Sequence, residues 1–121
     1  MTAFVVLRPG DRGEPGWVEA RSVGEVEELV RAGHTVAVTP ARLAAGASLT
    51  PPENGGDRGD GGAAAKERDA EAAELTAASI CAWAGARVFR TDRAEQVRLA
   101  VEMTDALAGR RPPALTRRGL A

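Results

Sequence analysis

The chain has 121 residues, with 16 lysines and arginines against 17 aspartates and glutamates. This length fits one domain, and the near-zero net charge gives no general attraction to nucleic acid or to anionic membranes. A single cysteine excludes an internal disulfide, and no apolar run has the length of a membrane span or the form of a secretory signal. We therefore expect a cytoplasmic protein without a bound metal or other cofactor.

The first third of the chain predicts a strand, a loop and a helix. The apolar run 3–7 (AFVVL) is typical of a strand covered on both faces, and the glycine- and proline-rich segment 8–16 predicts a loop. Residues 22–33 predict a helix, because Ser22 and Glu25 have the spacing of a capping box and a glycine closes the segment.

The middle of the chain predicts a second strand, a short helix and a long loop. Residues 34–39 (HTVAVT) are rich in β-branched side chains, and Pro40 suits the first position of a helix. Residues 47–65 are polar, full of turn formers and without periodicity, so we expect a mobile loop there.

The last half of the chain predicts a helix, a strand and a final helix. Residues 67–84 form an alanine-rich helix ended by a glycine, residues 87–91 a third strand, and residues 93–108 the last helix. Residues 110–121 form a basic tail that cannot continue this helix past its two prolines. The positions expected to face inward are Ala73, Ala77, Ile80, Cys81, Ala84, Val97, Val101, Thr104 and Ala108.

This order of elements predicts an α/β fold made of three βα units with a short parallel sheet, in a single domain over residues 1–109. A three-stranded parallel sheet has two open edges, and its core here is built from small side chains. We therefore expect a homo-oligomer or a second protein that completes the sheet. Leu99 and Met103, on the outer side of the last helix, are candidates for covering that contact.

Several motifs in this order resemble the C-terminal portion of dihydropteroate synthase, the pterin-binding (β/α)8 barrel enzyme of folate synthesis. VVLRPG resembles the family's sixth-strand motif LDPG, and VEELVRAGHTVAVTPARLAAG resembles its sixth helix and seventh strand. ERDAEAAELTAASICAWAGARVFRTD resembles the seventh helix and eighth strand, and QVRLAVEMTDAL the eighth helix. The resemblance implies the last three βα units of a barrel whose first five units are absent.

The resemblance implies an anion or pterin site at Arg90 and Arg42, with no catalytic residue. Arg90 matches the family arginine that helps to hold the diphosphate, and Arg42 falls at the lysine that contacts the pterin. Two other positions depart from the family: Arg8 stands where an aspartate is expected, and Asp92 where a histidine is expected. Each departure reverses or adds charge where the family binds its substrate.

The residues themselves allow a plainer interpretation of these positions. Arg42 and Arg90 are also typical of solvated charges where strands end, and Asp92 has the spacing of a helix cap. His34 has no nearby nucleophile to activate, and Cys81 lies in an apolar stripe where a thiol is unreactive.

Three functions follow from the sequence. The preferred one is a non-catalytic, dihydropteroate synthase-like interaction or ligand-binding module. The alternative is a dihydropteroate synthase-type transferase that becomes active when a partner chain supplies the missing strands. The third is a binder of a pterin or phosphate ligand without chemistry.

Overall fold

A computed structural model describes residues 3–47 and 62–109 of the chain. Within these ranges it has one parallel sheet, whose strands follow the order β1-β4-β3-β2. The strands are β1 (Val5–Leu7), β2 (Trp17–Glu19), β3 (Thr35–Val38) and β4 (Val88–Arg90). The helices are α1 (Val23–Arg31), α2 (Pro40–Ala47), α3 (Gly62–Ala84) and α4 (Ala94–Leu107). The expected α/β class and parallel sheet are confirmed.

The sheet differs from the sequence prediction in one strand and in its order. β2 was not predicted, because three residues are too short for an alternating pattern to be recognised. It extends the sheet beside β3 and makes four strands in place of three. Consecutive units of a (β/α)8 barrel would place β1 beside β3, whereas β4 lies between them in this chain.

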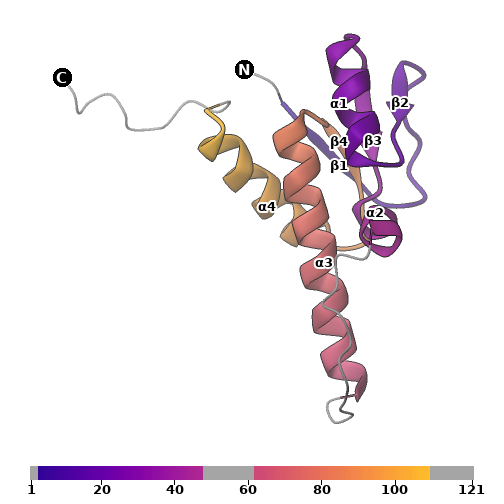
Figure 1. The fold of residues 1–121 in the computed structure, drawn as a ribbon. Coiled ribbons are helices and arrows are strands. Elements are labelled where there is room, and N and C mark those ends of the chain that lie inside the picture. Colours follow the sequence, from indigo (N-terminus) through magenta and orange to yellow (C-terminus); the bar gives the residue numbers. More distant parts are fainter. Residues whose placement is uncertain (1–2, 48–61, 110–121) are drawn as a thin grey trace, which may run out of the picture.

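The helices α1, α3 and α4 cover one face of the sheet, and α2 packs against α3 (Figure 1). Alternate strand residues point to this face and join the helix side chains in one core. Most of the core side chains are alanine or valine, and Phe89 is the largest of those that are fully buried. The core includes Ala20, Val26, Val36, Val38, Leu43, Ala77, Ala78, Cys81, Phe89, Val97 and Val101.

The connection between β1 and β2, residues 8–16, covers the other face of the sheet. β1 and β2 lie at opposite edges, so this connection has to cross the sheet, and the helices occupy the first face. Ala37 and Val88 are paired neighbours outside the helix-side core, yet they are only 2% and 1% exposed. The sheet is therefore buried on both faces at its centre.

Gly13 allows this connection to lie close to the sheet. A Cβ atom at Gly13 would be 2.9 Å from Arg90 Nη2 and 3.2 Å from Trp17 Cε3, so a larger residue would push these side chains aside. Arg90 Nη1 also donates a hydrogen bond of 3.1 Å to the carbonyl of Asp11. The loop is thus fastened to β4 as well as to its own two strands.

Helix α1 begins much as its sequence predicts. The Ser22 side chain accepts a hydrogen bond of 3.1 Å from the Glu25 N–H, which satisfies one amide of the first turn. The Glu25 carboxylate accepts from the Arg21 N–H at 2.7 Å, one residue earlier than in a full capping box. The helix is followed by Gly33, whose φ of +93° suits glycine.

Two predictions about α3 and α4 are wrong in detail. Ile80 is 39% exposed, because the buried stripe of α3 passes through its neighbours at positions 77, 78, 81 and 82. Asp92 is not the cap of α4: the N-cap is Arg93, whose N–H donates to Thr91 Oγ1 at 2.9 Å. The Thr91 hydroxyl thus satisfies the N–H of the N-cap residue itself, and Arg93 makes no side-chain cap hydrogen bond.

The bounds predicted for the loop at 47–65 are wrong at both ends, since α2 includes residue 47 and α3 begins at residue 62. Residues 48–61, like the expected tail 110–121, lie outside the described residues. In the two described ranges, no helix combines the length and the apolar character that crossing a membrane requires.

Candidate anion-binding pocket

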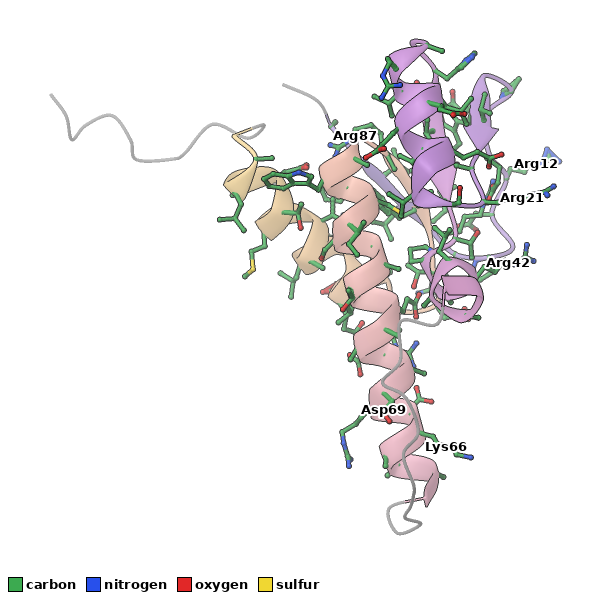
Figure 2. The ribbon with its side chains drawn as sticks, viewed as in Figure 1. Arg12, Arg21, Arg42, Lys66, Asp69 and Arg87 are labelled. Carbon is green, nitrogen blue, oxygen red and sulfur yellow. The ribbon has the colours of Figure 1, made fainter. Side chains whose placement is uncertain are left out.

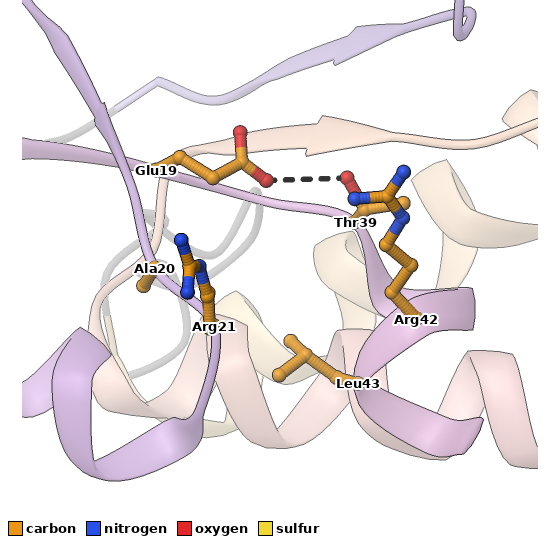
Figure 3. A pocket seen from close by; sticks show the side chains of 6 residues that line it. All are labelled: Glu19, Ala20, Arg21, Thr39, Arg42 and Leu43. Atoms are coloured by element: carbon orange, nitrogen blue, oxygen red, sulfur yellow. Dashed lines mark hydrogen bonds between the residues drawn. The ribbon is translucent and has the colours of Figure 1, made fainter. Parts of the chain in front are cut away.

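A pocket of about 250 Å³ lies where β2 and β3 end and α1 and α2 begin. Figure 3 shows Arg21 and Arg42 on opposite sides of it, with Leu43 below and the bond between Glu19 and Thr39 above. The carboxyl ends of neighbouring parallel strands are the common ligand-binding position of open α/β sheets. The six lining residues are Glu19, Ala20, Arg21, Thr39, Arg42 and Leu43.

The backbone on both sides of the pocket is fixed by helix starts. Arg21 immediately precedes the N-cap of α1, and its N–H is held by the Glu25 carboxylate. Arg42 lies in the first turn of α2, where its N–H donates to the Thr39 carbonyl at 2.9 Å. Two arginines therefore extend from ordered backbone to the same small space.

The guanidinium groups of Arg21 and Arg42 are available to a ligand. Both residues are exposed, and neither has an ion-pair partner within residues 3–47 and 62–109. Figure 2 shows both on the same side of the molecule, together with Arg12. Arginine presents donors in a planar fork that matches phosphate and carboxylate oxygens.

Among the described residues, Glu19 is the only acidic one that lines the pocket, and its carboxylate has partners of its own. Thr39 Oγ1 donates to Glu19 Oε2 at 3.3 Å, and Arg90 Nε lies 3.8 Å from Glu19 Oε1. Arg90 thus offsets the charge of Glu19, and the two pocket arginines leave a local excess of positive charge. The electrostatic balance favours an anion.

The two arginines predicted as site residues have different positions. Arg42 lines the pocket, whereas Arg90 donates to the carbonyl of Asp11 and lies beside the Glu19 carboxylate. Arg90 is thus close to Glu19, a lining residue, but does not itself line the pocket. Arg8, the charge-reversed position, is exposed at the end of β1, and its N–H donates to the Asp11 carboxylate at 3.0 Å.

Arg87 and Arg93 have a different role, because acidic side chains hold both of them. Arg87 makes a bidentate pair with Asp105, with N–O distances of 3.0 and 2.9 Å, and both side chains are buried. Arg93 bonds Glu74 at 2.6 Å and also pairs with Glu67. The bond to Glu74 is the main cause that raises the pKa of Arg93. The first pair joins the residue before β4 to α4, and the second joins the start of α4 to α3.

The cysteine, the histidine and the possible metal ligands do not form a second site in the described part of the chain. Burial raises the pKa of the Cys81 thiol to about 11, so the reactive thiolate is disfavoured. His34 is exposed at the start of β3, where its N–H donates to the Leu29 carbonyl at 3.0 Å. Among the described residues, no three side chains of metal-binding type come together.

Glu19 and Arg21 are pocket residues that the sequence did not reveal. Both depend on β2, whose three residues gave no strand signal. The capping box at Ser22 did place the start of α1, so a charged residue just before it could have been considered. That Arg21 faces Arg42 follows only from the pairing of β2 with β3.

The fold and the pocket define an α/β protein with a candidate site for a small anion. Comparisons with family models, with curated proteins and with solved structures found no match to this chain. The resemblance to dihydropteroate synthase accordingly stays a prediction.

Proposed function

We propose that this chain is a non-catalytic binding module for a small phosphate-bearing ligand, held between Arg21 and Arg42. The observation that carries the proposal is that these two exposed arginines lie on opposite sides of one pocket and have no ion-pair partner among the described residues. Two arginines around one small space repel each other unless an anion is present. A bound phosphate would remove that repulsion and accept hydrogen bonds from both.

The surroundings of the two arginines support an anion of limited size. Pockets for drug-sized ligands usually enclose roughly 300–1,000 Å³, and this one encloses about 250 Å³. Leu43 and Ala20 add an apolar wall beside the charged groups. Inorganic phosphate or a small phosphomonoester fits this description better than a whole pterin diphosphate does.

The first turn of α2 adds to the attraction. The N-terminal end of a helix carries partial positive charge from amides without helical partners. Arg42 belongs to that turn and lines the pocket, so its own charge and the helix end act on the same space. Solvent and salt screen both effects, and we expect the affinity for phosphate to fall as ionic strength rises.

The alternative, a transferase completed by a partner chain, has less support. In the family that the sequence resembles, the arginine matched by Arg90 holds the diphosphate, whereas Arg90 here is engaged by Glu19 and by the Asp11 carbonyl. A partner that supplied barrel strands would also meet a sheet in which β4 separates β1 from β3. If cells that lack their own synthase grew when they expressed this chain, alone or with a co-purified partner, that result would support the alternative.

Titration calorimetry with inorganic phosphate tests the binding proposal. We expect Arg21→Ala and Arg42→Ala each to weaken binding at least about tenfold, since each removes a charge-assisted hydrogen bond. Arg31→Ala is the matched control, because Arg31 is an exposed arginine in the last turn of α1 and does not line the pocket. Its affinity should equal that of the unchanged protein.

Two results would contradict the proposal. One is the absence of binding heat at millimolar phosphate under low salt. The other is an equal loss of affinity in all three variants, which would indicate general charge attraction. A parallel titration with a dihydropterin diphosphate shows whether a larger ligand of the resembled family uses the same arginines.

A further inference from the structure

Helix α4 presents a row of exposed apolar side chains, which we call the α4 stripe. It consists of Leu99, Met103 and Leu107, which are 63%, 65% and 78% exposed. Their spacing of four residues keeps them on one side of the helix, away from the buried Val97 and Val101. Figure 1 shows α4 at the outer end of the helix layer, with α3 as its helical neighbour.

We infer that a second copy of this chain packs its own α4 antiparallel on the α4 stripe. With a two-fold axis near Val101, Leu99 of each copy lies at the level of Met103 of the other. Leucine and methionine would then exchange contact with water for contact with each other, the usual origin of helix association. A self-complementary surface of this kind closes with two copies.

The charges beside the stripe select the antiparallel direction. Arg98 and Glu102 lie one turn apart on the same flank of α4, and in the described residues neither takes part in an ion pair. In an antiparallel pair, equal flanks of the two helices meet. Arg98 of one copy then lies about two residues, or about 3 Å along the axis, from the level of Glu102 of the other. A parallel pair would instead bring opposite flanks together, so Arg98 and Glu102 of one copy would not meet those of the other.

The sheet edges are less suited to the same purpose. β1 and β2 are the edge strands, and each is only three residues long. Arg8 and Pro9 follow β1 directly, and Pro15 precedes β2 by one glycine. Short strands flanked by proline and charge are the usual means by which proteins prevent strand addition at an edge. Away from these edges, the exposed large apolar side chains of the described residues lie on α3, with Ile80 and Trp83, and on α4, which carries the row of three.

Sedimentation equilibrium of the full chain, from about 1 to about 500 µM, tests this inference. We expect a monomer–dimer equilibrium whose dissociation constant rises at least about tenfold in Met103→Lys, because the new charge would be desolvated at the centre of the contact. Ile80→Lys is the control: Ile80 is also exposed and apolar but lies on α3, outside the stripe. It should leave the constant unchanged.

A charge exchange tests the direction of the helices. Arg98→Glu alone and Glu102→Arg alone should each weaken the dimer, whereas the double variant should restore it. Mixing the two single variants should give a heterodimer tighter than either homodimer, since one flank is then acidic and the other basic. A double variant as weak as the singles would overturn the antiparallel arrangement.

A monomer at every concentration would overturn the inference as a whole. Hydrogen exchange could then show that the amides around Leu99 are protected and lose this protection when residues 110–121 are removed. Together with the monomeric state, that result would assign the stripe to the chain's own C-terminal segment. Equal weakening by Ile80→Lys and Met103→Lys would also overturn it, because the stripe would then have no special part in association. None of these outcomes bears on phosphate binding, which is measured separately.

Discussion

Arginines in two regions of this molecule have opposite surroundings. Between α3, β4 and α4, Arg87 and Arg93 are held by carboxylates, and Asp105 and Glu74 are themselves only 3% exposed. Around the pocket at β2 and β3, Arg21 and Arg42 are exposed and have no such partner in the described residues. The same side chain thus holds elements together in one region and is left available in the other. The partners of each arginine, more than its position at the end of a strand, distinguish the two roles.

The largest expected effect comes from breaking the buried pair of the first region. Asp105→Ala leaves the Arg87 guanidinium without its carboxylate, and we expect the free energy of unfolding to fall by about 3–5 kcal/mol. Urea denaturation measures the loss. The double variant Arg87→Met with Asp105→Leu is the control, because it leaves no buried charge and should stay within about 1 kcal/mol of the unchanged protein. A loss below about 1 kcal/mol for Asp105→Ala would mean that the pair does not hold this region.

A smaller effect is expected from the thiol in the same region. Cys81 is fully buried, and burial raises the pKa of its thiol from 9.0 to about 11. The folded protein therefore keeps this proton at pH values where the unfolded chain has lost it, so stability falls as pH rises above 9. By pH 10.5 we expect a loss of about 2 kcal/mol from this group.

Denaturation of Cys81→Ala over the same pH range provides the comparison. Its stability should decline less between pH 8 and pH 10.5, by that same amount of about 2 kcal/mol. Parallel pH profiles for the two proteins would show that the thiol is not kept protonated by its surroundings. The core around α3 would then be more open to water than its burial indicates.

The smallest expected effect on stability is in the second region. Arg21→Ala and Arg42→Ala should each change the free energy of unfolding by less than about 0.5 kcal/mol, because exposed side chains without partners contribute little. Thermal or urea unfolding without phosphate measures this. If either variant lost more than about 1.5 kcal/mol, that arginine would be structural, and the contrast between the regions would disappear.

The sequence was sufficient for elements that carry their own local signals. The β-branched side chains of HTVAVT predicted β3, the Ser22 and Glu25 pair predicted the start of α1, and the glycine at position 85, where φ is +116°, predicted the end of α3. Local sequence was also enough for the outward position of Leu99 and Met103. Each of these depends on residues a few positions apart.

Features that depend on distant pairing were not predictable in this way. The place of β1 beside β4 instead of β3 is decided by how whole elements pack, and no short motif encodes it. β2 is stabilised by its pairing with β3, and without it neither Glu19 nor Arg21 could be assigned to a pocket. Arg42, which follows β3, an element with a clear signal, does line the pocket, and its role as a ligand residue stays a prediction.

The position of β1 has a consequence for how the chain is made. Val5 pairs with Val88, so β1 leaves the ribosome about 80 residues before its partner strand does. At roughly 5–20 residues per second, β1 waits for something like 4–16 s before its pairing surface exists. During that time AFVVL is an unpartnered apolar segment within reach of chaperones or of other nascent chains. The helical segments that follow can form first. β1 is synthesised before the other three strands and is then paired after them.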